Sequence, residues 1–168
     1  MCMKNVNAMF LLTTGVETLE NGIRSVGAIF NGIVPKAEES VYYLPDFSVV
    51  LNCSIIYNID AANKEIIDDE YDFKLDKKYE FMIRLTHIES GSGIALDTFD
   101  LELTRKDLKT WCKAFYEFKR FVKVPHLVVP KGLGNYAVKL LIREKTDDKN
   151  APWVTQTLSS LVVGERYQ

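Results

Sequence analysis

The sequence is poor in the residues that most directly indicate a metal site or a disulfide framework. It has three cysteines, no C-x-x-C spacing and only two histidines, His87 and His126. A zinc site of standard ligand spacing is therefore excluded, and a disulfide framework is disfavoured. Cys53 lies within an apolar strand pattern and is interpreted as a small core residue. This cysteine usage predicts a reduced, cytoplasmic protein.

Long apolar runs and an excess of one charge are also missing. The apolar stretch at residues 8–12 is too short for a signal-peptide core or a membrane span. The 21 basic and 23 acidic side chains give a formal charge of -2. We therefore expect no membrane segment, and nucleic-acid binding is disfavoured. The most basic window, residues 105–123, mixes lysines with aromatics, and we interpret it as a solvated face over a core face.

Catalytic motifs are missing as well. There is no G-x-S-x-G elbow and no phosphate loop, and the glycines around Leu133 lack the third glycine of a dinucleotide fingerprint. Ser90 and Ser92 lie close to His87 and Glu89, which keeps a small hydrolase as the third hypothesis. The Ser-Gly-Ser-Gly stretch is better explained as a hairpin turn. An enzyme is disfavoured, and no catalytic residue or cofactor is predicted.

The residues that are present favour a β protein. Runs of β-branched and aromatic residues alternate with Gly, Pro and Asn punctuation, most clearly at residues 128–136, where a turn separates two predicted strands. At 168 residues, 47% apolar and 26% charged, the chain is predicted to form a single domain over residues 1–168. We predict a mainly β fold: an antiparallel β-sandwich of about eight strands with one short α-helix.

The expected strands follow from apolar alternation. We expect a hairpin of residues 5–14 with 22–33, a long strand at 46–57, and a hairpin of 79–85 with 94–103. Further strands are expected at 121–129, 136–144 and 153–163. In the long strand, one face is predicted to be buried: Phe47, Val49, Leu51, Cys53 and Ile55.

The helix is expected after Thr104. Thr104 and Asp107 have the spacing of an N-terminal capping box. Apolar residues then follow at helical spacing: Leu108, Trp111, Cys112 and Phe115. The pattern predicts two or three helical turns.

Three motifs together resemble small uncharacterised bacterial proteins of a β-sandwich kind. They are the glycine-punctuated pattern at residues 22–30, the Leu-Pro-x-Phe-x-Val-Val pattern at 44–50, and the Pro-x-Gly turn that leads from residue 130 to Tyr136. The resemblance covers much of the chain in order. It implies the fold and no activity, and no catalytic residues are carried over.

An acidic stretch at residues 68–76 supports a second hypothesis. Oxygen ligands to calcium could come from Asp68, Asp69 and Asp72, although the spacing is not that of an EF-hand. The ordinary interpretation of such a stretch is a solvated surface loop. A ligand-binding or calcium-binding β-sandwich is therefore the alternative function.

Binding to protein is the first functional hypothesis. Exposed aromatic side chains are typical anchors of interfaces, and the candidates are Tyr42, Tyr43, Trp111 and Trp153. The sequence therefore predicts a non-catalytic interaction module that binds another protein or assembles as a homo-oligomer.

Overall fold

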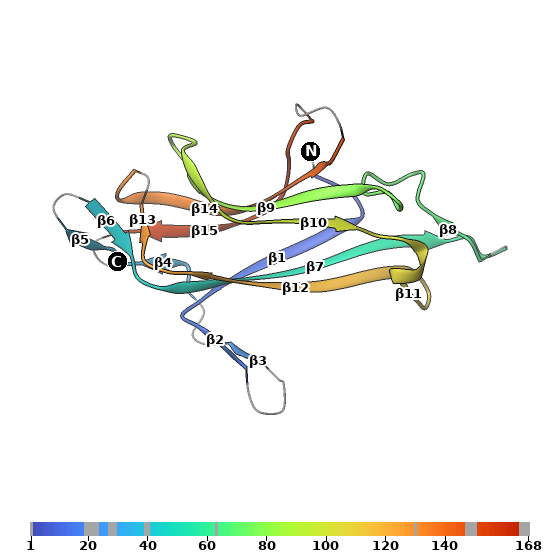
Figure 1. Cartoon of the computed structure of the whole chain (residues 1–168), viewed down its shortest axis with the longest axis horizontal. Helices are drawn as coiled ribbons and strands as arrows, with labels where there is room; N and C mark the ends of the chain where they lie inside the picture. The colour runs from blue at the N-terminus through green and yellow to red at the C-terminus, as the bar shows by residue number, and fades with distance from the viewer. Residues whose placement is uncertain are drawn as a thin grey trace.

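The computed structural model describes residues 2–18, 24–26, 30–38, 41–62, 64–129, 131–146 and 151–164. Within these ranges the chain is mainly β, as predicted, with fifteen strands and one 3₁₀ turn, η1 (Arg105–Asp107). The strand count is therefore higher than expected. Figure 1 shows the long strands running roughly along the longest axis of the molecule. The described residues include no helix with the length and apolarity needed to cross a membrane.

The first large sheet, sheet I, has the antiparallel strand order β1-β7-β12-β11. Its strands are β1 (Val6–Thr13), β7 (Phe47–Ile59), β12 (Ala114–Val124) and β11 (Lys109–Thr110), and β8 (Ile66–Ile67) pairs with the end of β7. The predicted inner face of β7 is confirmed, because Phe47, Val49, Leu51, Cys53 and Ile55 are all buried. Pairing with β1 on one side and with β12 on the other places β7 inside the sheet.

The second large sheet, sheet II, has the order β10-β9-β14-β15-β4. Its strands are β10 (Gly93–Glu102), β9 (Lys78–His87), β14 (Gly134–Glu144), β15 (Val154–Val163) and β4 (Gly32–Ile33). All pairs are antiparallel except the short contact of β4 with the end of β15. The predicted hairpin of residues 79–85 with 94–103 corresponds to β9 and β10.

The two sheets pack as layers through their apolar faces. Phe81 of β9 and Phe99 of β10 both contact the ring of Phe118 on β12, with ring centroids 5.9 and 5.8 Å apart. Where β10 and β12 lie opposite each other, Arg120 bridges the layers. Its Nε lies 2.7 Å from Asp97 Oδ2, and its guanidinium lies over the Phe99 ring. One apolar core therefore draws on both layers.

Shorter strands lie outside the two layers. The pair β2 (Val16–Thr18) and β3 (Arg24–Val26) projects away from them in Figure 1. A three-stranded sheet consists of β5 (Lys36–Glu38), β6 (Val41–Leu44) and β13 (Leu127–Val128). At its end, Asp46 accepts a hydrogen bond from the His126 backbone N–H at 2.8 Å.

The predicted helix after Thr104 is wrong. The capping contact exists, because Asp107 accepts a 2.7 Å hydrogen bond from the Thr104 backbone N–H, but it closes only the 3₁₀ turn. Leu108 is already extended (φ -85°, ψ 134°), and β11 follows. Aromatics on both faces of β12 imitate a helical spacing, but burial alternates along this strand, and pairing with β7 along its whole length favours the extended form.

Two predicted connections are also wrong. The strand ladder of β1 is with β7 and not with residues 22–33, which share one described backbone hydrogen bond with it, from the Phe30 N–H to the Leu12 carbonyl at 3.0 Å; residues 19–23 and 27–29 lie outside the described residues. The turn before Tyr136 joins no hairpin either, because β13 pairs with β6 whereas β14 belongs to sheet II. Turn residues fix a local change of direction and not the partner of the next strand.

Candidate functional site

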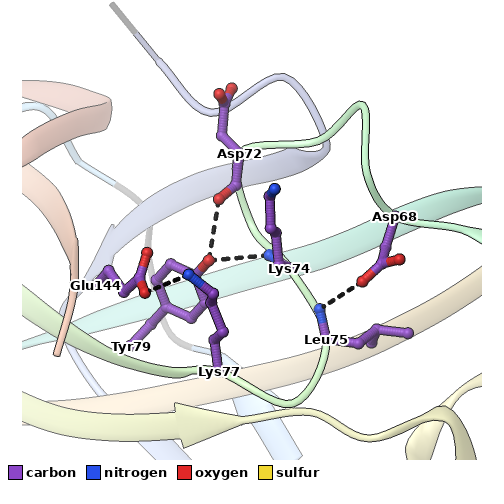
Figure 2. A network of polar contacts seen from close by, with 7 residues as sticks. All are labelled: Asp68, Asp72, Lys74, Leu75, Lys77, Tyr79 and Glu144. Atoms are coloured by element: carbon purple, nitrogen blue, oxygen red, sulfur yellow. Dashed lines mark hydrogen bonds and ion pairs between the residues drawn. The ribbon is translucent and has the colours of Figure 1, made fainter. Parts of the chain in front are cut away.

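The acidic loop at residues 68–76 is held by backbone contacts. Figure 2 shows the Tyr79 hydroxyl, which accepts a hydrogen bond from the Lys74 N–H at 2.9 Å and donates one to the Asp72 carbonyl at 3.0 Å. Just before β1, the buried side-chain amide of Asn5 donates a hydrogen bond to the Phe73 carbonyl and accepts one from the Phe73 N–H. The loop is thus clamped from two sides.

Two of the three predicted calcium ligands already bind protein groups. Asp68 accepts a hydrogen bond from the Leu75 N–H, and Asp72 accepts one from the Lys4 N–H. Asp69 is exposed on the loop. Within the described ranges, no group of three or more His, Cys, Asp or Glu side chains is placed to hold a metal ion. Calcium binding stays a prediction, and the described geometry gives it no support.

Burial perturbs several ionisable groups in the core. It raises the pKa of the Cys53 thiol to about 12. It also raises the pKa values of Tyr57, Tyr79 and Tyr136. Tyr136 donates to the Gly132 carbonyl at 2.8 Å, and Tyr79 has the partners given above, but the buried hydroxyl of Tyr57 has no hydrogen-bond partner among the described residues. These tyrosines therefore differ in how well their hydroxyls are satisfied.

The residues of the hydrolase hypothesis meet in the turn between β9 and β10. Ser90 Oγ lies 3.0 Å from His87 Nδ1, and the same nitrogen lies 3.3 Å from the Ser90 backbone N–H. Ser90 Oγ also accepts a hydrogen bond from the Ser92 N–H. On the other side of the ring, Nε2 faces the backbone of Gly134 instead of a carboxylate that could orient a base. The arrangement is that of a stabilised turn.

The four aromatic candidates occupy different environments. Trp111 is 86% exposed at the tip of the β11–β12 hairpin. Trp153 is half-buried beneath the Arg143 guanidinium, 4.3 Å from the ring centroid. Tyr42 packs against the core, and Tyr43 stacks on His126. Only Trp111, of these four, presents its ring fully to solvent.

Strand β1 of sheet I and strand β15 of sheet II run close together, and we call the surface that they form the β1/β15 side. Gln156 of β15 bridges the two layers there. Its side-chain oxygen accepts from the Met3 N–H at 2.8 Å, and its nitrogen donates to the carbonyls of Met3 and Val6. Part of both strand edges is also used on this side, because the Leu12 carbonyl accepts from the Phe30 N–H and the end of β15 pairs with β4.

The open edges follow from the hydrogen bonds that are made. Val162 N–H donates to the Asn31 carbonyl, away from β14, so alternate residues of β15 also point their backbone groups outward. These are Leu158 and Ser160, for which the described residues provide no backbone partner. Neither β1 nor β15 contains a charged residue. Strand edges without charge are open to pairing with another strand.

No protein-family model matches this chain, and a search of curated proteins finds no match. Among solved structures, the CooA pilin subunit from enterotoxigenic Escherichia coli is 10% identical, with a TM-score of 0.31. The alignment covers 92% of this chain and 98% of that chain. A similarity of this size carries no argument about function. The resemblance to uncharacterised bacterial sandwich proteins stays a prediction.

Sequence reasoning missed the β1/β15 side, although one signal for it was present. Residues 154–163 form a ten-residue run of strong strand formers with no charge and no proline. The pattern predicted a strand, but its place next to an edge depends on pairings between distant segments. Those pairings are not visible in any local window.

Proposed function

We propose that the protein is a non-catalytic, cytoplasmic interaction module that assembles with a second copy of itself through the free edge of β15. The observation that supports this proposal is the edge itself, where the backbone groups of Leu158 and Ser160 point outward and meet no backbone partner among the residues that the structure describes. A strand from a second chain satisfies those groups by continuing the sheet.

The side chains next to this edge suit a symmetric pair. Leu158 is 55% exposed and Val162 is 51% exposed, both on the outer face of sheet II. In an antiparallel pair of β15 strands related by a two-fold axis, edge residues of one copy meet edge residues of the other, and each contact off the axis occurs twice. Two apolar side chains are then covered, and no charge meets a like charge.

The opposite edge of sheet II, formed by β10, is charged and does not suit a symmetric pair. β10 carries three acidic residues, Asp97, Asp100 and Glu102. In a symmetric antiparallel pair these carboxylates would lie close to carboxylates of the second copy, which is unfavourable. The distribution of charge therefore favours β15 as the pairing edge.

Sedimentation velocity between about 1 and 100 μM tests the proposal, because a dimer is a concentration-dependent species. Leu158→Lys places like charges across the proposed two-fold axis and is expected to yield a monomer. Thr98→Lys, at an exposed position of β10, is the matched control and is expected to leave the dimer intact.

A second variant shows whether a monomeric Leu158→Lys protein reflects the lost contact or a folding defect. Ser160→Pro removes an outward N–H without removing a hydrogen bond inside sheet II, and it is also expected to yield a folded monomer. A wild-type protein that stays monomeric at about 100 μM contradicts self-assembly. The interaction hypothesis would then be limited to the binding of a different protein at the same edge.

A further inference from the structure

The outer face of sheet I, turned away from the core, contains a groove of about 520 Å³ that crosses β1, β7 and β12. Two rows of residues, aligned by strand register, form its floor. One row is Asn7, Ser54 and Glu117, and the next is Met9, Asn52 and Lys119. Lys109 of β11 lines the end near the β11–β12 hairpin. We call this surface the sheet I groove.

The polar side chains of the sheet I groove make no hydrogen bonds or ion pairs with the described protein. This applies to the two amides, the hydroxyl, the carboxylate and both ammonium groups: Asn7, Asn52, Ser54, Glu117, Lys109 and Lys119. Asn52 and Ser54 are half-buried on the central strand, so their unused groups lie within the groove floor. Half-buried polar groups without partners are costly unless water or a ligand satisfies them.

The outer face of sheet II is built differently. Glu80 and Arg143 form an ion pair of 2.7 Å there, and Asp100 accepts from Lys78 and Lys145 at 3.0 and 2.8 Å. Five charged groups on that side are thus paired within the protein, whereas Arg84, Glu102 and Lys139 have no ion pair among the described residues. The two faces differ in degree, because every polar side chain of the sheet I groove is without a described partner.

The groups in the groove indicate the chemistry of a ligand. Amide, ammonium and hydroxyl groups donate hydrogen bonds, and the amide oxygens and Glu117 accept them. A ligand that both donates and accepts at closely spaced positions fits this set, as the hydroxyls of a sugar do. A polyanion fits poorly because the Glu117 carboxylate lies between the lysines on the floor.

Trp111 lies beyond one end of the groove, next to the stretch that Lys109 begins. It sits at the hairpin tip opposite Lys113, about 13 Å along the strand direction from Glu117 at 3.3 Å per residue. The apolar C–H face of a pyranose ring packs favourably on an indole face. An extended ligand can therefore use the groove floor and the tryptophan together.

We propose that the sheet I groove binds an uncharged oligosaccharide, with sugar hydroxyls bound by Asn7, Asn52, Ser54 and Glu117 and a neighbouring ring stacked on Trp111. This site is independent of the β15 edge used for self-assembly. The proposal therefore stands or falls separately from the proposed dimer.

The test starts with a printed array of linear hexasaccharides of glucose, mannose, galactose and N-acetylglucosamine, followed by isothermal titration calorimetry with the strongest binder. Asn52→Ala is expected to weaken binding at least about tenfold, because the ligand then loses a hydrogen-bonding group in a half-buried position. Trp111→Ala is expected to weaken the hexasaccharide strongly and the matching disaccharide little.

Matched lysine variants locate the site. Lys119→Ala lies in the groove and is expected to lower the affinity, whereas Lys139→Ala makes the same change on the outer face of sheet II and is expected to leave it unchanged. The melting temperature of each variant shows that it is folded. Ser54→Ala replaces Asn52→Ala if the latter does not fold.

Three results would overturn the proposal. One is the absence of any binding on the array at about 1 mM sugar, a concentration at which even weak complexes form. Another is binding that survives Asn52→Ala and Lys119→Ala unchanged. The third is occupation of the groove by single-stranded dT12 or by a peptide in preference to every sugar, which would assign the site to that ligand class.

Discussion

The substitutions Tyr57→Phe and Tyr79→Phe test how much the hydrogen bonding of a buried hydroxyl contributes to the stability of the fold. The chemical change is the same, both rings are buried, and only the hydrogen bonding of the hydroxyl differs. Tyr79 Oη has two backbone partners, whereas Tyr57 Oη has none in the part of the chain that the structure describes. Tyr79→Phe should therefore lower the stability, whereas Tyr57→Phe should not.

The magnitudes follow from the partners. Tyr79→Phe removes two hydrogen bonds at a partly buried position and is expected to cost about 1–2 kcal/mol of unfolding free energy. For a chain of this length that corresponds to a melting temperature lower by roughly 2–8 °C. Tyr57→Phe removes a hydroxyl whose burial costs free energy that no described hydrogen bond offsets. The substitution is therefore expected to leave the stability unchanged or to raise it by up to about 2 kcal/mol.

Urea unfolding followed by tryptophan fluorescence and far-UV circular dichroism measures both changes. The alkaline pH dependence provides a second readout, since burial raises the pKa of Tyr57 above its usual value. The stability from this shift is fully present below about pH 10 and declines as the pH rises above it. Tyr57→Phe is expected to reduce that alkaline decline. A loss of stability in Tyr57→Phe equal to that in Tyr79→Phe would refute the reasoning.

Three further predictions concern glycine, thiols and calcium. Gly134→Ala should destabilise, because Gly134 has φ +146° and a Cβ there would lie 2.8 Å from His87 Nε2, whereas Gly15→Ala meets no atom within 4 Å and should be tolerated in thermal melts. Ellman's reagent should modify two thiols in the native protein and Cys53 only after unfolding, since the other two cysteines are exposed. Calcium at about 5 mM should leave the melting temperature unchanged, and a shift abolished by Asp68→Asn would restore the calcium hypothesis.

Local patterns in the sequence predicted most of the long strands. Alternation located β7, β9, β10, β14 and β15 because each has one face in the core, where period-two burial leaves a clear signal. It failed near Trp111, where aromatics on both faces of β12 imitate a helical period. Burial against sheet II and pairing with β7 decide that segment, and neither can be read from a short window.

The two proposed binding surfaces were harder to predict than the strands. Trp111 is exposed, as an interface anchor needs to be, although the helix to which it was assigned is absent, and its role in binding stays a prediction. The sheet I groove brings together residues as distant as Asn7 and Lys119, which are aligned only through β7. No spacing rule links such positions. The β15 edge was visible as an uncharged run, but its exposure depends on the order of strands.

The order of strands also has a consequence for how the chain folds during synthesis. Among the described long strands, only β9 with β10 and β14 with β15 pair as neighbours in sequence. The thirteen-residue β7 contains no charge and needs β12 on its far side. At ordinary translation speeds, roughly 3–13 s pass between the synthesis of Ile59 and that of Val124. During that interval β7 has one unprotected edge, so the central strand of the finished sheet is also the segment that a nascent chain must keep from aggregating.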